Sequence, residues 1–457
     1  MRLGYERLGL QGGETLGLFG TTYLVDIAPG VAVGPALYGA VSGRRGGFFT
    51  YGAEVAWRTH LAASLELGFG TFFGGGGGGA APQGGGLMLR PHADLLWHAG
   101  GPYLLGLSLA DVRFPNGRID STQLGVVLEV ASDFASFPAA GLDVARSAPG
   151  RTGVGVDRVQ TLASVYRPRP GTRRLDGSAA PAQIALLGVR AEQAFGSGRY
   201  WGVEANGAAA ASVSGYAETL GTLAFEGSLA DRVHVGTRVA LGMGGGGALP
   251  VGGGLLAKAA LYGRVELTDA LALSLEAGAM SAPRGGLRAA TIAGSLVWAL
   301  EPAHDAGASS PPVRIDVGAG VERFAARRVD GTRRSVTVDV LTASRFVAPN
   351  LYLSGQVHSA VAGAGGGYSA ALLGLGWSAT PLAARWLAGT EVLAGPAGGG
   401  GVYSRGSIVQ WNAYAGLRLT PAIALRASGG WLGSTRGGSG SAVVGIGLIA
   451  SFGVNAP

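Results

Sequence analysis

A threefold internal repeat constrains the fold of this chain more than any other feature. An acidic residue followed by an arginine opens each copy, and glycine-rich patches follow in each copy. Self-similarity in a fixed order indicates that one unit was multiplied, so the architecture must be inferred from that unit. The opening pairs are Glu6 with Arg7, Asp157 with Arg158, and Glu322 with Arg323.

Each unit has the period of two that is typical of β-strands. Over residues 255–267, one face carries Leu, Ala, Gly and Val, whereas the other carries Lys258, Tyr262, Arg264 and Glu266. This alternation indicates a strand with one apolar and one polar face. Runs between turn signals predict eight strands in the second unit, and the first and third units yield the same number. The predicted strands lie near 152–166, 183–196, 200–213, 216–229, 232–243, 255–267, 270–282 and 287–300.

Three units of eight strands predict an all-β fold, a transmembrane antiparallel β-barrel of about 24 strands. The units span residues 1–134, 152–300 and 313–457, and the segments 135–151 and 301–312 join them. Three separate eight-stranded barrels are the alternative. Small barrels fill their interiors with side chains, and the inward positions are mostly Ala, Gly and Ser. We therefore expect all three units to lie within one wide barrel.

The composition favours a membrane protein. Charged residues make up only 14% of the chain, too few to cover a water-soluble protein of this size. No apolar stretch is long enough for a membrane-spanning helix, whereas a closed barrel pairs every backbone group between its strands. The absence of cysteine excludes thiolate metal sites and disulfides. Met1 runs straight into a strand pattern, so no signal peptide is visible, although export to the outer membrane requires one.

Two segments resemble outer-membrane β-barrel proteins of the porin type, without matching a particular porin family. Residues 419–425 read Leu-Thr-Pro-Ala-Ile-Ala-Leu, a turn that leads into a strand. The last strand ends with Gly447, Ala450 and Phe452, and looks like the C-terminal assembly signal of that class, although five residues follow Phe452. The resemblance implies a location in the Gram-negative outer membrane.

We expect this barrel to act as a passive pore or export conduit for small or polymeric hydrophilic solutes. The competing hypothesis is a structural or interaction barrel that scaffolds a partner or a surface assembly. Expected partners are outer-membrane lipids and lipopolysaccharide, with a possible periplasmic or surface protein, and no nucleic acid.

The positions of the tryptophans indicate how the barrel is oriented in the membrane. If the tight connections face the periplasm, both termini lie there, as an even strand number requires. Six of the eight tryptophans then fall at periplasmic strand ends, where a girdle of aromatic residues is expected. They are Trp57, Trp97, Trp201, Trp298, Trp377 and Trp386.

The acidic–arginine pairs have two interpretations. Neighbours on a strand point to opposite faces, so we expect the acid to face the lumen and the arginine to face outward. Three lumenal carboxylates would form a ring that filters cations. We favour instead a role in fixing strand register through pairs with adjacent strands, because buried polar groups need partners.

Two predicted outer loops are rich in arginine. They can gather anionic solutes or bind lipopolysaccharide phosphates, because arginine binds phosphate through two hydrogen bonds. The alternative is a solvated loop tip in a chain with net charge +7. The loop arginines are Arg167, Arg169, Arg173 and Arg174, and Arg327, Arg328, Arg333 and Arg334.

The sequence contains no pattern for catalysis, a cofactor or a metal ion. The glycine runs lack the Lys-Ser or Lys-Thr that a phosphate-binding loop requires, so we expect flexible loops or close approaches of strands. The six histidines show no ligand spacing. No Gly-x-Ser-x-Gly motif is present. We therefore expect no enzymatic activity.

Overall fold

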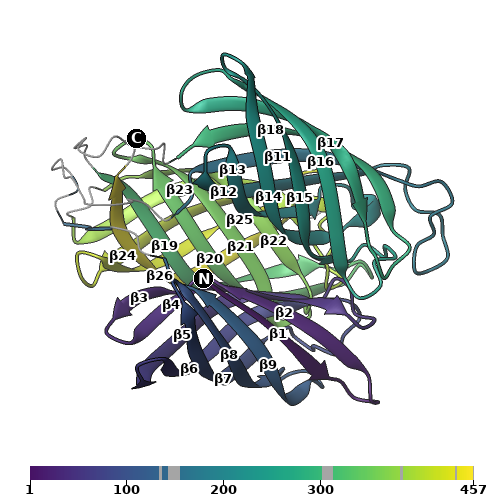
Figure 1. Ribbon diagram of the computed structural model, residues 1–457, viewed down its shortest axis with the longest axis horizontal. Coiled ribbons are helices and arrows are strands. Elements are labelled where there is room, and N and C mark those ends of the chain that lie inside the picture. The colour runs from purple at the N-terminus through teal and green to yellow at the C-terminus, as the bar shows by residue number, and fades with distance from the viewer. Residues whose placement is uncertain are drawn as a thin grey trace.

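The computed structural model describes residues 1–132, 136–140, 142, 155–300, 312–380, 384–437 and 440–455. Antiparallel strands form three separate eight-stranded barrels. In Figure 1 the first barrel is purple to blue at the bottom, the second is teal at the top, and the third is green to yellow beside them. Among the described residues the one helix is a short 3-10 turn, η1 (Ala211–Val213). None of these residues forms a helix that could span a membrane.

The first barrel is closed by pairing between β2 and β4, while the short strand β3 pairs with β4 alone. Its strands are β1 (Arg2–Gly9), β2 (Thr15–Thr22), β3 (Val25–Ala28), β4 (Val31–Ser42), β5 (Phe49–Ala62), β6 (Leu65–Gly77), β7 (Met88–Gly100), β8 (Tyr103–Arg113) and β9 (Asp120–Val130).

The second barrel is closed by pairing between its first and last strands. Its strands are β11 (Arg158–Pro168), β12 (Ile184–Gly196), β13 (Arg199–Ala208), β14 (Ala217–Ala230), β15 (Val233–Gly245), β16 (Leu255–Glu266), β17 (Leu271–Ser281) and β18 (Arg288–Ala299).

The third barrel is closed in the same way, and the short strand β10 (Phe137–Pro138) adds to its last strand. Its strands are β19 (Pro312–Arg327), β20 (Arg333–Phe346), β21 (Leu351–Gly363), β22 (Ser369–Ser378), β23 (Trp386–Gly398), β24 (Gly406–Arg418), β25 (Ile423–Ser434) and β26 (Gly440–Asn455).

The all-β class and the three eight-stranded units are confirmed, but closure into one wide barrel is wrong. Each unit closes on itself because its own first and last strands pair, as Arg158 opposite Ala299 illustrates. Predicted strand limits in the second unit lie within a few residues of the observed ones, apart from its first strand and from β13, which ends at Ala208. The proposed linkers 135–151 and 301–312 fall mostly outside the described residues.

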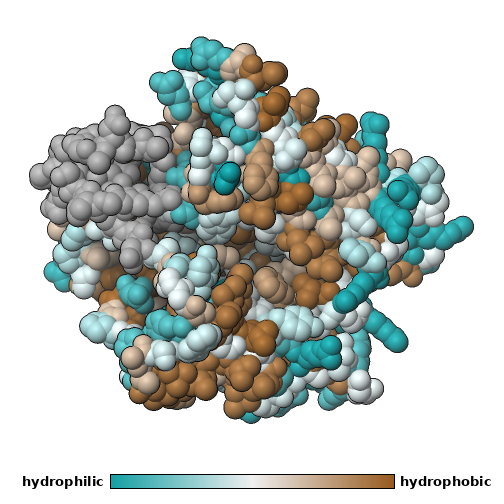
Figure 2. Space-filling view, viewed as in Figure 1, coloured by the Kyte–Doolittle hydropathy of each residue, from teal (hydrophilic) through white to brown (hydrophobic). Residues whose placement is uncertain are grey.

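Apolar side chains cover the outside of the barrels. Leu261, Leu275 and Leu241 are among the most exposed large hydrophobic residues, and each alternates along its strand with buried or partly buried neighbours. Figure 2 shows apolar residues gathered along the lower edge of the molecule, over the first barrel. Closed antiparallel barrels with apolar exteriors and polar interiors have the construction of outer-membrane β-barrels.

The glycine-rich loops join the three barrels to one another. Backbone hydrogen bonds connect the first barrel to the second, from the N–H of Gly46 to the carbonyl of Gly252 (3.1 Å), and the third to the first, from Gly367 to Gly76 (3.0 Å). At Gly47, with φ at +87°, a Cβ atom would lie 2.5 Å from a backbone nitrogen of the second barrel. Glycine is therefore required where these backbones approach closely.

Candidate functional site

Charged side chains fill the centre of the second barrel. Alternation along β12, β13, β16 and β17 directs Arg190, Glu204, Lys258 and Glu276 inward, and all four are at most 5% exposed. Lys258 Nζ lies 2.9 Å from Glu204 and 3.2 Å from Glu276. Arg190 also pairs with both carboxylates. Each cation therefore has two acidic partners, which offset the cost of burying its charge.

A second charged layer lies nearer the end of the barrel that carries the tight turns. Arg158 Nε lies 2.7 Å from Glu192, and Arg158 Nη1 lies 3.2 Å from Glu226. Arg238 contacts Glu192 at 3.1 Å. The guanidinium of Arg158 also stacks over the ring of Tyr200, with 3.7 Å to the ring centroid. Together the two layers close the lumen.

The first barrel contains a similar arrangement. Arg90 binds both oxygens of Glu6 at 2.9 and 3.0 Å. Arg2 Nη2 donates to both oxygens of Asp94 at 3.0 Å. Glu54 accepts a hydrogen bond of 2.7 Å from the hydroxyl of Tyr38. All six of these residues are buried.

The third barrel uses amides in place of most of the cations. Glu391 accepts hydrogen bonds from Arg426 (2.6 Å), Gln356 (3.0 Å) and Asn412 (3.2 Å). Its neighbour across the lumen, Glu322, accepts one from Gln410 at 2.9 Å. This lumen too is occupied by its own side chains.

The cavities within two of the lumens are of water size. One of about 30 Å³ lies in the third barrel beside Arg314, Tyr352 and Arg426. One of about 10 Å³ lies in the first barrel beside Glu54 and Arg58. Cavities of this size hold one or a few water molecules. These two lumens therefore combine fixed charges with cavities that are no larger than a few water molecules.

The structure corrects the predictions for the acidic–arginine pairs. Glu6 and Glu322 do face lumens, but in the second barrel Arg158 points inward instead of Asp157. The carboxylates cannot form one ring, because the three barrels enclose separate lumens. Glu6 and Glu322 bind residues across the lumen rather than on adjacent strands, because an eight-stranded barrel is narrow enough for side chains to span. Asp157 does bind a neighbouring strand, at the amide of Ala194 on β12.

The outward arginines of these pairs and the basic loops lie at the surface. Arg7 and Arg323 are exposed, and Arg323 donates to Ser335 at 2.8 Å. Arg174 and Arg328 are half-buried and donate to the backbone carbonyls of Ser212 and Gly400, so they join loops within their barrels. The other loop arginines are exposed: Arg167, Arg169, Arg173, Arg327, Arg333 and Arg334.

The two basic loops share one turn. In each, an aspartate oxygen accepts hydrogen bonds from the amide and hydroxyl of the residue two positions later, Ser178 for Asp176 and Thr332 for Asp330. These hydrogen bonds lower the pKa of both carboxyl groups. The turn satisfies the aspartates, and arginines beside it such as Arg169 and Arg334 are exposed to solvent.

The six tryptophans of the predicted girdle lie within five residues of the turn-side end of their strands. Trp201 and Trp298 are half-buried, and the other four are exposed. They are Trp57, Trp97, Trp201, Trp298, Trp377 and Trp386.

The residues of the proposed assembly signal lie on β26. Ala450 and Phe452 share the outward face with Ile446 and Leu448, while Gly447 lies on the other face. The strand continues past Phe452 to Asn455 and pairs with both β19 and β10.

Sequence reasoning missed most of the lumenal network. Arg190, Glu192, Glu204 and Arg238 were not recognised as site residues, although each occupies a strand position with inward alternation. Charged residues at every second position of an otherwise apolar strand were the available signal.

No protein-family model matches the chain, and no curated protein matches it. Solved structures with some similarity include the ferric enterobactin receptor PfeA of Pseudomonas aeruginosa, with 11% identity and a TM-score of 0.31 over 99% of this chain and 81% of that chain. OccK11 of the same organism has 14% identity and a TM-score of 0.23 over 99% and 94%. OccAB2 of Acinetobacter baumannii has 8% identity and a TM-score of 0.25 over 99% and 96%.

Proposed function

We propose that the chain is an integral outer-membrane protein. The apolar exteriors of three closed barrels with charged interiors carry this proposal, because exposed leucines such as Leu261 are stable in lipid and costly in water. Outer-membrane lipids would cover these faces, and the exposed loop arginines would contact lipopolysaccharide. Fractionation of the expressing cells tests the location. Recovery in the soluble fraction in native form would contradict it.

Within the membrane, we propose a structural or interaction role for the three-barrel body. The filled lumens support this role most directly, because the buried ion pairs around Glu204 and Glu276 occupy the centre of the second barrel. Export of a polymer needs one wide lumen, whereas the described strands enclose three narrow ones. The test is the conductance of the purified protein in planar bilayers. We expect no sustained open-pore current, and a stable large conductance would contradict the proposal.

A narrow channel for small ions is the second candidate. Arg190 and Lys258 each contact both Glu204 and Glu276, so either cation can exchange partners without losing all of its pairing. Such exchange could open a path for water and ions. Brief, small current steps in the wild-type protein, altered in Glu276→Gln, would support this function over the structural one.

A further inference from the structure

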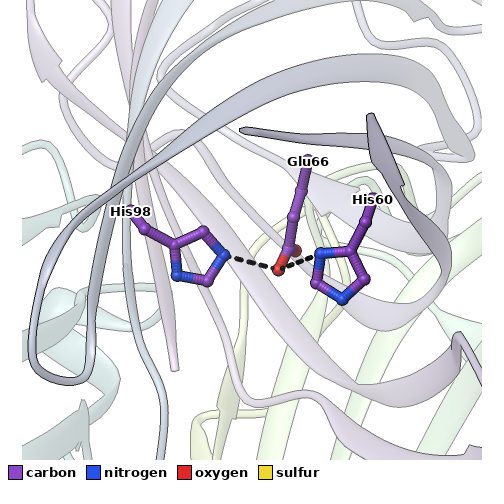
Figure 3. A group of neighbouring side chains, drawn as sticks. All are labelled: His60, Glu66 and His98. Atoms are coloured by element: carbon purple, nitrogen blue, oxygen red, sulfur yellow. Dashed lines mark hydrogen bonds and ion pairs between the residues drawn. The ribbon is translucent and has the colours of Figure 1, made fainter. Parts of the chain in front are cut away.

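Two histidines and one glutamate meet at the turn-side rim of the first barrel. His60 lies near the end of β5, Glu66 at the start of β6 and His98 near the end of β7, so three neighbouring strands supply them (Figure 3). His60 and Glu66 are directly opposite in the strand ladder. The amide of His98 donates to the carbonyl of Ser64 at 3.0 Å, which fixes the third strand beside the β5–β6 turn.

Both imidazoles direct a nitrogen toward the same carboxylate oxygen. His98 Nε2 lies 2.8 Å and His60 Nδ1 lies 3.5 Å from Glu66 Oε1 (Figure 3). All three potential ligand atoms lie within 4.8 Å of one another. Ligands of a tetrahedral zinc ion at 2.0–2.1 Å are about 3.3 Å apart, so small side-chain rotations would produce this spacing. The backbone already places the three ligands.

The exposure of the cluster permits entry of an ion. The side chain of His60 is 75% exposed and that of His98 is 37% exposed, whereas Glu66 is 11% exposed and anchors the group. Two imidazoles and one carboxylate favour borderline divalent ions such as Zn²⁺ and Cu²⁺ over Mg²⁺ and Ca²⁺, which prefer oxygen ligands. Water would complete the coordination.

The second barrel provides an internal comparison. At the same strand positions, next to the same bulge, Ser228 replaces His60, His234 replaces Glu66 and Glu266 replaces His98. Only one imidazole is present there, and Arg264 already contacts the carboxylate of Glu266 at 2.8 Å. The pair of histidines is therefore specific to the first barrel.

We propose that His60, Glu66 and His98 form a binding site for one divalent transition-metal ion at the rim of the first barrel. The imidazoles bind through His60 Nδ1 and His98 Nε2, and the carboxylate of Glu66 supplies the third ligand. Binding displaces the proton shared between His98 and Glu66, because each ligand must present a lone pair. The histidines showed no ligand spacing in the sequence because they lie on different strands.

The test uses the full chain without a histidine tag, folded in detergent, with Zn²⁺ as the probe in calorimetry. We expect one Zn²⁺ per chain in the wild type, and binding at least tenfold weaker in His60→Ala, in His98→Ala and in Glu66→Gln. Co²⁺ in place of Zn²⁺ should give visible absorption bands in the wild type that the double variant His60→Ala/His98→Ala lacks.

His234→Ala is the matched control, since it removes a rim histidine from the second barrel and should bind as the wild type does. Heat-dependent gel migration of every variant verifies that the barrels have folded. Absence of saturable Zn²⁺ binding in the wild type would overturn the proposal. Unchanged affinity in the folded double variant would also overturn it.

Discussion

Removal of the Glu204 carboxylate should strongly destabilise the second barrel. This side chain is fully buried and binds Arg190 and Lys258, and it also accepts a hydrogen bond of 2.8 Å from Asn206. Hydrogen bonds to charged groups contribute roughly 1.5–3 kcal/mol each. After Glu204→Ala both cations retain Glu276, so part of the pairing survives. We therefore expect the loss of unfolding free energy to be about 3–5 kcal/mol, the range for a broken buried ion pair.

The assay is urea unfolding in lipid vesicles, followed by tryptophan fluorescence. Asp269→Ala is the matched control, because Asp269 is fully exposed in a tight turn and contacts Arg232 only at 3.8 Å. It should leave the unfolding midpoint unchanged. A loss below about 1 kcal/mol for Glu204→Ala would refute the reasoning. It would mean that water enters the lumen and solvates the released cations, which would favour the channel over the structural role.

Three further predictions concern the exterior, the contacts between barrels and the loops. Leu261→Arg should lower the free energy of unfolding by about 2–4 kcal/mol if the outer face is in lipid. The same change at the exposed loop residue Leu175 should leave the free energy of unfolding almost unchanged in the same urea assay. Gly47→Ala should lower the unfolding midpoint more than Gly12→Ala, because both have positive φ but only Gly47 meets another backbone within 4 Å; equal midpoints would contradict this. Hydrogen bonding lowers the pKa of Asp330 in the folded protein. The carboxylate therefore stabilises its turn fully above the ordinary pKa of an aspartate, and this stabilisation is lost as the pH falls through the lowered pKa of the folded state. A carbon NMR titration of the carboxyl group can follow this loss.

Much of the fold could be predicted from the sequence because alternation is a local property. The alternation over residues 255–267 predicted the two faces of this strand correctly, because Lys258 and Tyr262 are buried and Leu261 is exposed. Closure could not be predicted in this way. It depends on pairing between strands as distant as β11 and β18, and no local pattern distinguishes a partner within the unit from one in the next unit.

The content of the lumens was misjudged for a related reason. Counting small residues at inward positions suggested an open bore, but one arginine such as Arg190 spans an eight-stranded barrel and meets carboxylates from other strands. The contacts between these charged side chains depend on how the strands are aligned around the closed barrel. The cluster of His60, Glu66 and His98 was missed for the same reason.

Because one polypeptide contains all three barrels, their association does not depend on protein concentration. A trimer of separate chains would dissociate on dilution, whereas tethered barrels meet at a high effective concentration. A small number of contacts, such as the one between Gly46 and Gly252, can therefore keep the barrels associated. The same tether frees each barrel from the identity that a homotrimer imposes, so the first barrel has histidines at positions 60 and 98 where the second has Ser228 and Glu266.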